Sequence, residues 1–238
     1  MWRALSDLLL PRTCLVCGNG LGAQETDLCL FCAADLPLTY YWERPHNPMA
    51  DEFNAVLERW RPQGAPLDYA YAAALLFYHH ENPYKKIPQA LKYGHNLGAG
   101  RRFAARLGSL LASQPHFSDV DVVIPVPLHW FRHWRRGYNQ SAVLARELAR
   151  SLGASLRTDV LCRSRRTRSQ TAFSAEDRLR NVSGVFSVRR RLSCARHILL
   201  VDDTFTTGAT LAACFWTLRR VLGPSVRISV ATLSVVEA

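Results

Sequence analysis

The stretch from His197 to Leu211, HILLVDDTFTTGATL, constrains the fold more than any other part of the chain. The apolar run Ile198–Val201 is bounded by turn residues, which is typical of a strand that is covered on both faces of a parallel sheet. Asp202 and Asp203 follow this run, and a loop of hydroxyl residues then leads into a helical pattern. Because parallel strands deliver their loops to the carboxyl edge of the sheet, where ligands bind, we expect a ligand site here.

The loop after this strand has the chemistry of a phosphate site. Its N–H groups and hydroxyls lie at a predicted helix N-terminus, where the dipole favours an anion. Gly208 would let the backbone approach a ligand closely, since it has no Cβ. The two carboxylates have the wrong charge for a phosphate, so they predict contacts with sugar hydroxyls, a cation, or both. A phosphorylated ribose has both features, and a phosphate loop of another α/β fold is the alternative. The candidate residues are Asp202, Asp203, Thr206, Thr207, Gly208, Ala209 and Thr210.

Two acidic residues followed by Thr-Thr-Gly-x-Thr resemble the signature of type I phosphoribosyltransferases. In that family the loop holds the 5-phosphate and ribose hydroxyls of phosphoribosyl pyrophosphate (PRPP). The resemblance implies a doubly wound, largely parallel α/β sheet, with PRPP bound at residues 202–210 and Mg²⁺ on its pyrophosphate. A loop of the Walker type would need a lysine before its Ser/Thr, and none is present.

Four of the seven cysteines form two CxxC pairs that are separated by eleven residues. They are Cys14, Cys17, Cys29 and Cys32. Tetrahedral zinc takes four thiolates, and a segment too short to bury much apolar surface would gain folding energy from the metal. We therefore expect a structural Zn²⁺ site in a small zinc-ribbon-like segment. A redox pair or disulfides are the alternatives.

The remaining pattern predicts the domain organisation. Residues 1–37 form the four-cysteine knuckle, 38–66 a connector with one short helix near Asp51–Trp60, and 67–238 a phosphoribosyltransferase-like domain. Strands and helices alternate after residue 67, which predicts an α/β unit. The expected strands are Tyr69–Tyr78, Asp121–Pro127, Leu156–Leu161, Val185–Val188 and Val226–Val236, and the expected helices include Pro83–Tyr93, Gly100–Ser113 and one through Leu211–Leu222.

The charge of the chain predicts an anionic partner. The formal net charge is +11, and 27 of the 30 basic residues are arginines, which bind phosphates bidentately. The candidates for holding pyrophosphate are Lys92, Arg132, Arg135 and Arg136. A solvated basic turn is the alternative for the three arginines. A long polar insertion at Leu161–Asn181 is typical of a lid over a site. The candidate lid residues are Arg165, Thr167, Gln170, Arg178 and Asn181.

Several motifs together narrow the resemblance. The cysteine knuckle, PVPL, RGYNQ, R-x-T-x-x-Q and R-x-x-N resemble the ComF family of competence-associated proteins, which also includes GntX. The matching positions are Pro125, Pro127, Arg136, Gly137, Asn139, Gln140, Arg165, Thr167, Gln170, Arg178, Asn181 and Phe186. Tyr138 and Phe173 depart from the usual Phe and Leu.

The resemblance to the ComF family implies a role in DNA uptake during natural transformation, through the handling of single-stranded DNA near the inner membrane. DNA-uptake proteins would then be partners. The alternative is an active transferase that moves phosphoribose to a nitrogen nucleophile with release of pyrophosphate. A third hypothesis is an adaptor that binds only protein.

No segment approaches the 18 apolar residues of a membrane span, and the N-terminus lacks the features of a signal peptide. We therefore expect a cytoplasmic protein, with peripheral association with the inner membrane left open.

Overall fold

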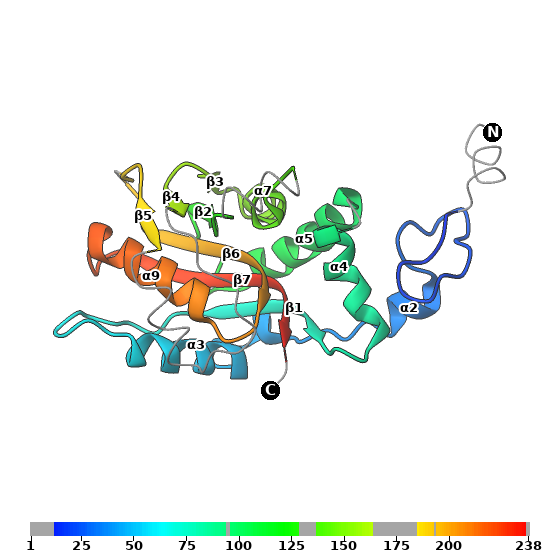
Figure 1. The fold of residues 1–238 in the computed structure, drawn as a ribbon, viewed down its shortest axis with the longest axis horizontal. Coiled ribbons are helices and arrows are strands. Elements are labelled where there is room, and N and C mark those ends of the chain that lie inside the picture. The colour runs from blue at the N-terminus through cyan, green and yellow to red at the C-terminus, as the bar shows by residue number, and fades with distance from the viewer. Residues whose placement is uncertain (1–11, 94–95, 129–136, 164–184, 193, 237–238) are drawn as a thin grey trace.

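The computed structural model describes residues 12–93, 96–128, 137–163, 185–192 and 194–236. Its centre is a five-stranded sheet with the strand order β1-β7-β6-β2-β3, in which every neighbouring pair is parallel (Figure 1). The strands are β1 (Ala72–Tyr78), β2 (Val122–Pro125), β3 (Ser155–Leu156), β6 (His197–Phe205) and β7 (Arg227–Val236). A separate antiparallel ribbon pairs β4 (Leu161–Arg163) with β5 (Phe186–Val188). The predicted α/β class with a largely parallel sheet is confirmed.

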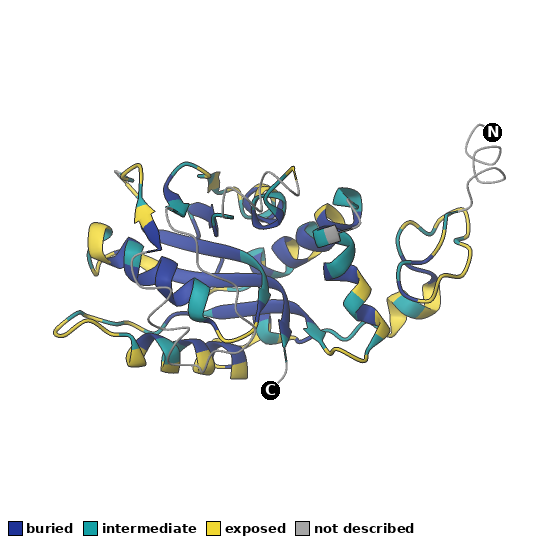
Figure 2. Ribbon diagram, viewed as in Figure 1, coloured by how far each residue is buried: buried dark blue, intermediate teal, exposed yellow. Residues whose placement is uncertain are grey.

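Helices cover both faces of the sheet. One layer contains α3 (Pro48–Arg59) and α9 (Ala209–Leu222), and the other contains α4 (Lys86–Tyr93), α5 (Leu97–Ala112) and α7 (Gln140–Leu152). Short elements complete the fold: α2 (Leu30–Ala34) and the 3₁₀ turns Tyr41–Glu43 and Pro83–Lys85. In Figure 2 the strands are dark blue throughout most of their length, whereas the outer side of α3 is yellow. No helix in the described part of the chain has the length and apolarity needed to cross a membrane.

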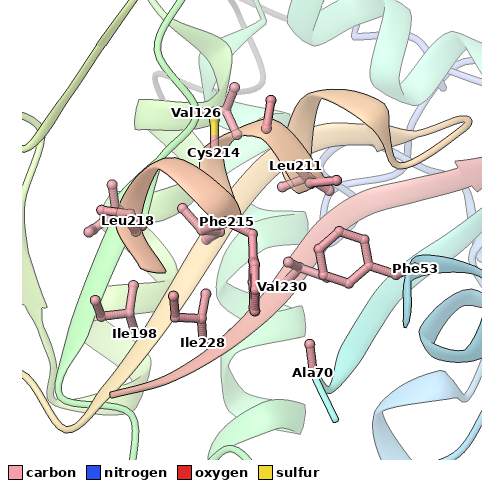
Figure 3. Packing of buried hydrophobic residues seen from close by; sticks show 14 of the residues in the cluster. Phe53, Ala70, Val126, Ile198, Leu211, Cys214, Phe215, Leu218, Ile228 and Val230 are labelled. Carbon is pink, nitrogen blue, oxygen red and sulfur yellow. The ribbon is translucent and has the colours of Figure 1, made fainter. Parts of the chain in front are cut away.

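The two-residue period of the strands divides the core between the two helical layers. Ile198 and Leu200 of β6 pack in the cluster with α9, whereas Leu199 and Val201 pack in the cluster with α5 and α7. This is why the apolar run of β6 is continuous rather than alternating. Figure 3 shows the α9 side, where the helix lays a row of side chains against β6 and β7. Labelled there are Leu211, Cys214, Phe215 and Leu218 of α9 with Ile198, Ile228 and Val230 of the strands.

Helix α3 lies within the segment that the sequence predicts to be a connector. It begins at Pro48, after the N-cap Asn47, whose side chain accepts a hydrogen bond of 3.0 Å from the Ala50 N–H. Phe53 is fully buried and makes edge-on contacts with the rings of Phe205 and Phe215. Residues 38–66 thus contribute a helix to the core of the α/β unit.

Two expected strand boundaries differ from the structure. Strand β6 does not end at Val201 but continues through both acids to Phe205, because Asp202 and Thr204 pair with residues of β7. The expected strand Leu156–Leu161 is instead split between β3, which extends the main sheet, and β4, which pairs with β5.

The order of the strands indicates where a ligand would bind. From β2 the chain passes through α7 on one face to β3 at the edge, whereas from β6 it passes through α9 on the other face to β7. The direction of winding therefore reverses between the neighbouring strands β2 and β6. A crevice outside the carboxyl ends of two such strands is the usual binding site in open α/β sheets.

Candidate functional site

A cavity of about 260 Å³ lies at the carboxyl ends of β2 and β6. Five separate parts of the chain contribute to it: α4, the segment after β2, the first turn of α7, the end of β4, and the end of β6 with the start of α9. The lining residues are Lys92, Val126, Pro127, Leu128, Gln140, Ser141, Arg163, Asp202, Asp203 and Thr210. The cavity therefore occupies the switch point that the strand order defines.

Asp202 and Asp203, the acid pair, place two carboxylates in this cavity. Asp202 Oδ1 accepts hydrogen bonds of 2.8 Å from the Ser141 hydroxyl and 2.8 Å from the Asp203 N–H. Burial, followed by the neighbouring charge of Asp203, raises the pKa of Asp202 to about 7, although these hydrogen bonds and Lys92 act in the opposite direction. The pair thus stores electrostatic repulsion that a cation or a hydroxyl donor would relieve.

Lys92 reaches the same cavity from α4, which lies on the opposite face of the sheet from α9. Its Nζ lies 3.1 Å from Asp203 Oδ1 and donates to the Thr204 hydroxyl over 3.2 Å. The sequence predicts Lys92 only as a holder of pyrophosphate. The structure places it beside the acids, where it both neutralises Asp203 and presents a cation to the cavity.

The loop between β6 and α9 has a specific backbone conformation that depends on Gly208. Thr206 and Thr207 are exposed, and Gly208 is the N-cap of α9 with φ +66°. A Cβ at Gly208 would lie 2.9 Å from Phe205 Cζ and 3.4 Å from Phe53 Cδ2. The left-handed backbone at Gly208 and the aromatic rings beside it both favour glycine at this position, and the expected close approach to a ligand stays a prediction. Ala209 and Thr210, both half-buried, open α9, and Thr210 lines the cavity.

The other predicted site residues fall in parts of the chain that the structure does not describe. These are the pyrophosphate candidates Arg132, Arg135 and Arg136 and the lid candidates Arg165, Thr167, Gln170, Arg178 and Asn181.

Sequence reasoning missed the part that the start of α7 plays. Asn139 caps α7 and its side-chain amide donates to the Val126 carbonyl, which fixes the first turn of the helix against the end of β2. Gln140 and Ser141 then face the cavity. Gln140 is 1% exposed, and its Nε2 has no hydrogen-bond partner among the described residues. A buried donor without an acceptor points to a ligand or ordered water in the cavity. The RGYNQ motif holds Gln140, but nothing in it indicates this orientation.

The four N-terminal cysteines form a second candidate site. Their Sγ atoms all lie within 4.8 Å of one another, and those of Cys17 and Cys29 are 3.7 Å apart. Burial alone would raise the pKa of Cys14, but N–H groups of Cys17, Cys29 and Val16 outweigh it and lower this pKa to about 6. Four sulfurs at this spacing match a tetrahedral site with metal–sulfur bonds of about 2.3 Å. The described residues thus contain a four-cysteine group that could hold a metal ion.

The described part of the knuckle, residues 12–37, is attached to α4, the helix that carries Lys92, and to the 3₁₀ turn before it. The Tyr84 hydroxyl donates to the Cys32 carbonyl over 3.1 Å, and Lys86 Nζ donates to the Val16 carbonyl over 2.7 Å. Arg102 of α5 forms an ion pair with Asp27. Figure 1 shows the knuckle with α2 at one end of the molecule, next to α4. The knuckle therefore contacts α4 and the turn before it, and it lies beyond the central sheet.

These features define an α/β protein with a polar cavity at the switch point of a parallel sheet and a four-cysteine knuckle at its N-terminal end. The chain is 35% identical over 138 residues to competence protein F of Haemophilus influenzae, which covers 56% of this chain and 60% of that protein. It is 41% identical over 92 residues to DNA utilization protein YhgH of Escherichia coli O157:H7, which covers 39% of this chain and 40% of that protein. The chain is a homologue of both, as the motifs predict. The matches span about 40 to 60% of the length of these relatives.

No protein-family model matches the chain. Among solved structures, the glutamine PRPP amidotransferase of B. subtilis resembles it with a TM-score of 0.40 and 19% identity, over 61% of this chain and 30% of that one.

Proposed function

We propose that this protein binds PRPP with Mg²⁺ in the cavity between β2 and β6 and takes part in DNA uptake. The observation that carries the first half is the cavity itself, which joins two carboxylates, a hydroxyl-rich helix N-terminus and a lysine at a switch point. The names of the two relatives, competence protein F and DNA utilization protein, support the second half.

Each part of PRPP has matching residues. The helix N-terminus at residues 206–210 suits the 5-phosphate, because its first N–H groups have no acceptor within the helix. Asp202 and Asp203 suit the ribose hydroxyls. The Lys92 ammonium and the Gln140 amide donors suit the pyrophosphate. Carboxylate oxygens are also ligands that Mg²⁺ prefers, and a divalent cation would offset the repulsion within the acid pair.

The binding of PRPP is tested by isothermal titration with and without Mg²⁺. Wild type should bind, and Mg²⁺ should tighten the complex. The double variant Asp202→Asn, Asp203→Asn should lose at least a hundredfold in affinity, since it removes both negative charges that would bind the ribose hydroxyls and Mg²⁺, yet it should remain folded. If the double variant binds PRPP as tightly as wild type, the ribose assignment is wrong.

The same preparation tests the transferase alternative. An active enzyme needs groups that take up the charge of the leaving pyrophosphate, and Lys92 is placed for this role. A screen for pyrophosphate release over nucleobases and amines would detect turnover, with Lys92→Met as the control that keeps the length of the side chain. Turnover that is lost in this variant would favour the transferase over a protein that only binds PRPP.

We also propose that the metal at the knuckle is Zn²⁺, held by Cys14, Cys17, Cys29 and Cys32. Zinc suits four thiolates at tetrahedral spacing, and the site has no open position, so the metal supplies folding energy rather than chemistry. We expect one zinc per chain in freshly purified, reduced protein, measured by elemental analysis.

The zinc prediction has a matched control. Cys29→Ser should lose the metal and make residues 12–37 sensitive to proteolysis while the sheet stays intact. Cys194→Ser, at an exposed cysteine outside the group, should keep the full metal content. Metal-free wild-type protein, or equal loss in both variants, would refute the zinc assignment.

A further inference from the structure

A second cavity of about 540 Å³ adjoins the first, and it is lined by none of the residues assigned to PRPP above. It lies between the first turns of α5 and α7, beside the end of β2. Pro127 and Leu128 line both cavities. The first turn of α7 separates the two, because Gln140 and Ser141 face the first cavity while Asn139 and Ala142 face the second.

The helices that border the second cavity direct positive charge toward it. Their first turns meet there through Leu97 and Ala142, and their later parts meet where the Cβ position of Gly108 is 2.7 Å from the Ser151 Cβ. Helices α5 and α7 therefore run side by side in the same direction, and both N-termini open on the cavity. The positive ends of the two dipoles then act on the same space.

Two arginines add to this field. Arg101 lies one turn after the start of α5, Arg146 lies in the second turn of α7, and both line the cavity. Their neighbours Arg102 and Arg150 pair with carboxylates, but among the described residues neither Arg101 nor Arg146 has an ion-pair partner. Two exposed guanidinium groups across one cavity are suited to a phosphate, which each can bind with two hydrogen bonds.

The rest of the wall is apolar and aromatic. Leu97, Pro125 and Val143 contribute aliphatic surface, and the Tyr138 hydroxyl donates to the Leu91 carbonyl, which holds the ring in place. A surface of this kind suits a planar base, which stacks or packs without sequence preference. The volume lies within the range of small-ligand sites, so one nucleotide fits.

We propose that this cavity binds a nucleoside phosphate, either a free nucleotide or the 5′-phosphorylated end of a single strand. The inference rests on the DNA part of the proposed function for the source of the ligand and is independent of the PRPP site. The phosphate lies at Arg101 and Arg146, and the base lies against the apolar wall.

The test is titration with dTMP, inorganic phosphate and a dT hexamer with or without a 5′-phosphate. Wild type should bind dTMP at least tenfold more tightly than inorganic phosphate, because the base adds contacts. Arg101→Ala with Arg146→Ala should weaken dTMP roughly tenfold or more. Arg106→Ala with Arg220→Ala removes the same charge from exposed positions of α5 and α9 outside the cavity, and should change affinity less than twofold. Ala142→Phe fills the cavity at constant charge and should weaken dTMP at least tenfold.

The hexamer distinguishes the two sources. Tighter binding of the 5′-phosphorylated hexamer than of dTMP identifies the strand as the source, and equal binding identifies the free nucleotide; both support the site. For the strand, the Arg101, Arg146 variant should flatten the log–log salt dependence by roughly 0.7, because the two arginines together neutralise one phosphate.

Three results would overturn the inference: no binding of dTMP, equal weakening by both arginine pairs, or inorganic phosphate binding as tightly as dTMP. Asp202→Asn with Asp203→Asn separates this inference from the PRPP proposal. It should lose PRPP and keep dTMP. If it loses dTMP too, the nucleotide occupies the first cavity and the second site is wrong.

Discussion

Replacing Gly208 with alanine should destabilise the protein by about 3 kcal/mol and disturb the loop between β6 and α9. The residue has φ +66°, which costs an L-residue about 1 kcal/mol. The new Cβ would also lie 2.9 Å from the Phe205 ring, which is buried against Phe53 and cannot move freely. Overpacking of this kind costs about 1–3 kcal/mol. Denaturant unfolding of Gly208→Ala measures the sum.

Gly153→Ala separates the two contributions. Gly153 ends α7 with the same φ of +66°, but nothing lies within 4 Å of its Cβ position. This variant should lose only the conformational part, about 1 kcal/mol. Equal losses at Gly153 and Gly208 would show that the contact with Phe205 has no energetic weight.

Replacing Asp202 with asparagine should stabilise the protein at pH 8 by about 2 kcal/mol while it weakens the site. Asparagine can still accept the hydrogen bonds from Ser141 and from the Asp203 N–H. It removes a charge whose burial raises the pKa of Asp202 from 3.8 to about 7. The full shift corresponds to about 4 kcal/mol, and solvent screening of a half-buried pair reduces it to about half.

The gain from Asp202→Asn should depend on pH. The folded protein keeps a proton on Asp202 that the unfolded chain releases near pH 4, so wild-type stability falls as pH rises toward 7. The difference between variant and wild type should therefore be near zero at pH 4 and complete above pH 7. Glu43→Gln removes an exposed carboxylate and should change stability by less than about 0.5 kcal/mol at any pH. A gain that is equal at pH 4 and pH 8 would mean that Asp202 is not held protonated by its surroundings.

The sequence predicts the α/β class and the cysteine cluster because both depend on local sequence patterns. The continuous apolar run of β6 requires helices on both faces, and the paired CxxC spacing requires four sulfurs to meet. The switch point follows once the strand order is known. The strand order itself depends on pairing between distant segments, which no local pattern encodes.

The composition of the site depends on such distant contacts. Ser141 reaches Asp202 from 61 positions away, and Lys92 reaches Thr204 from 112 positions away. The sequence predicts the short helix near Asp51–Trp60, which α3 matches, but it does not predict that this helix packs in the core, because Pro and charged residues surround its buried positions. The packing reason for Gly208 could not be predicted from the sequence, since only the folded structure places the Phe205 ring next to it.

We propose that the cavity between β2 and β6 binds PRPP. A crystal structure of the protein with PRPP and Mg²⁺ would test this proposal. We expect density for the 5-phosphate at the N-terminus of α9, for the ribose hydroxyls at Asp202 and Asp203, and for the pyrophosphate beside Lys92. PRPP bound elsewhere, with this cavity unchanged and Lys92 still paired with Asp203, would contradict it.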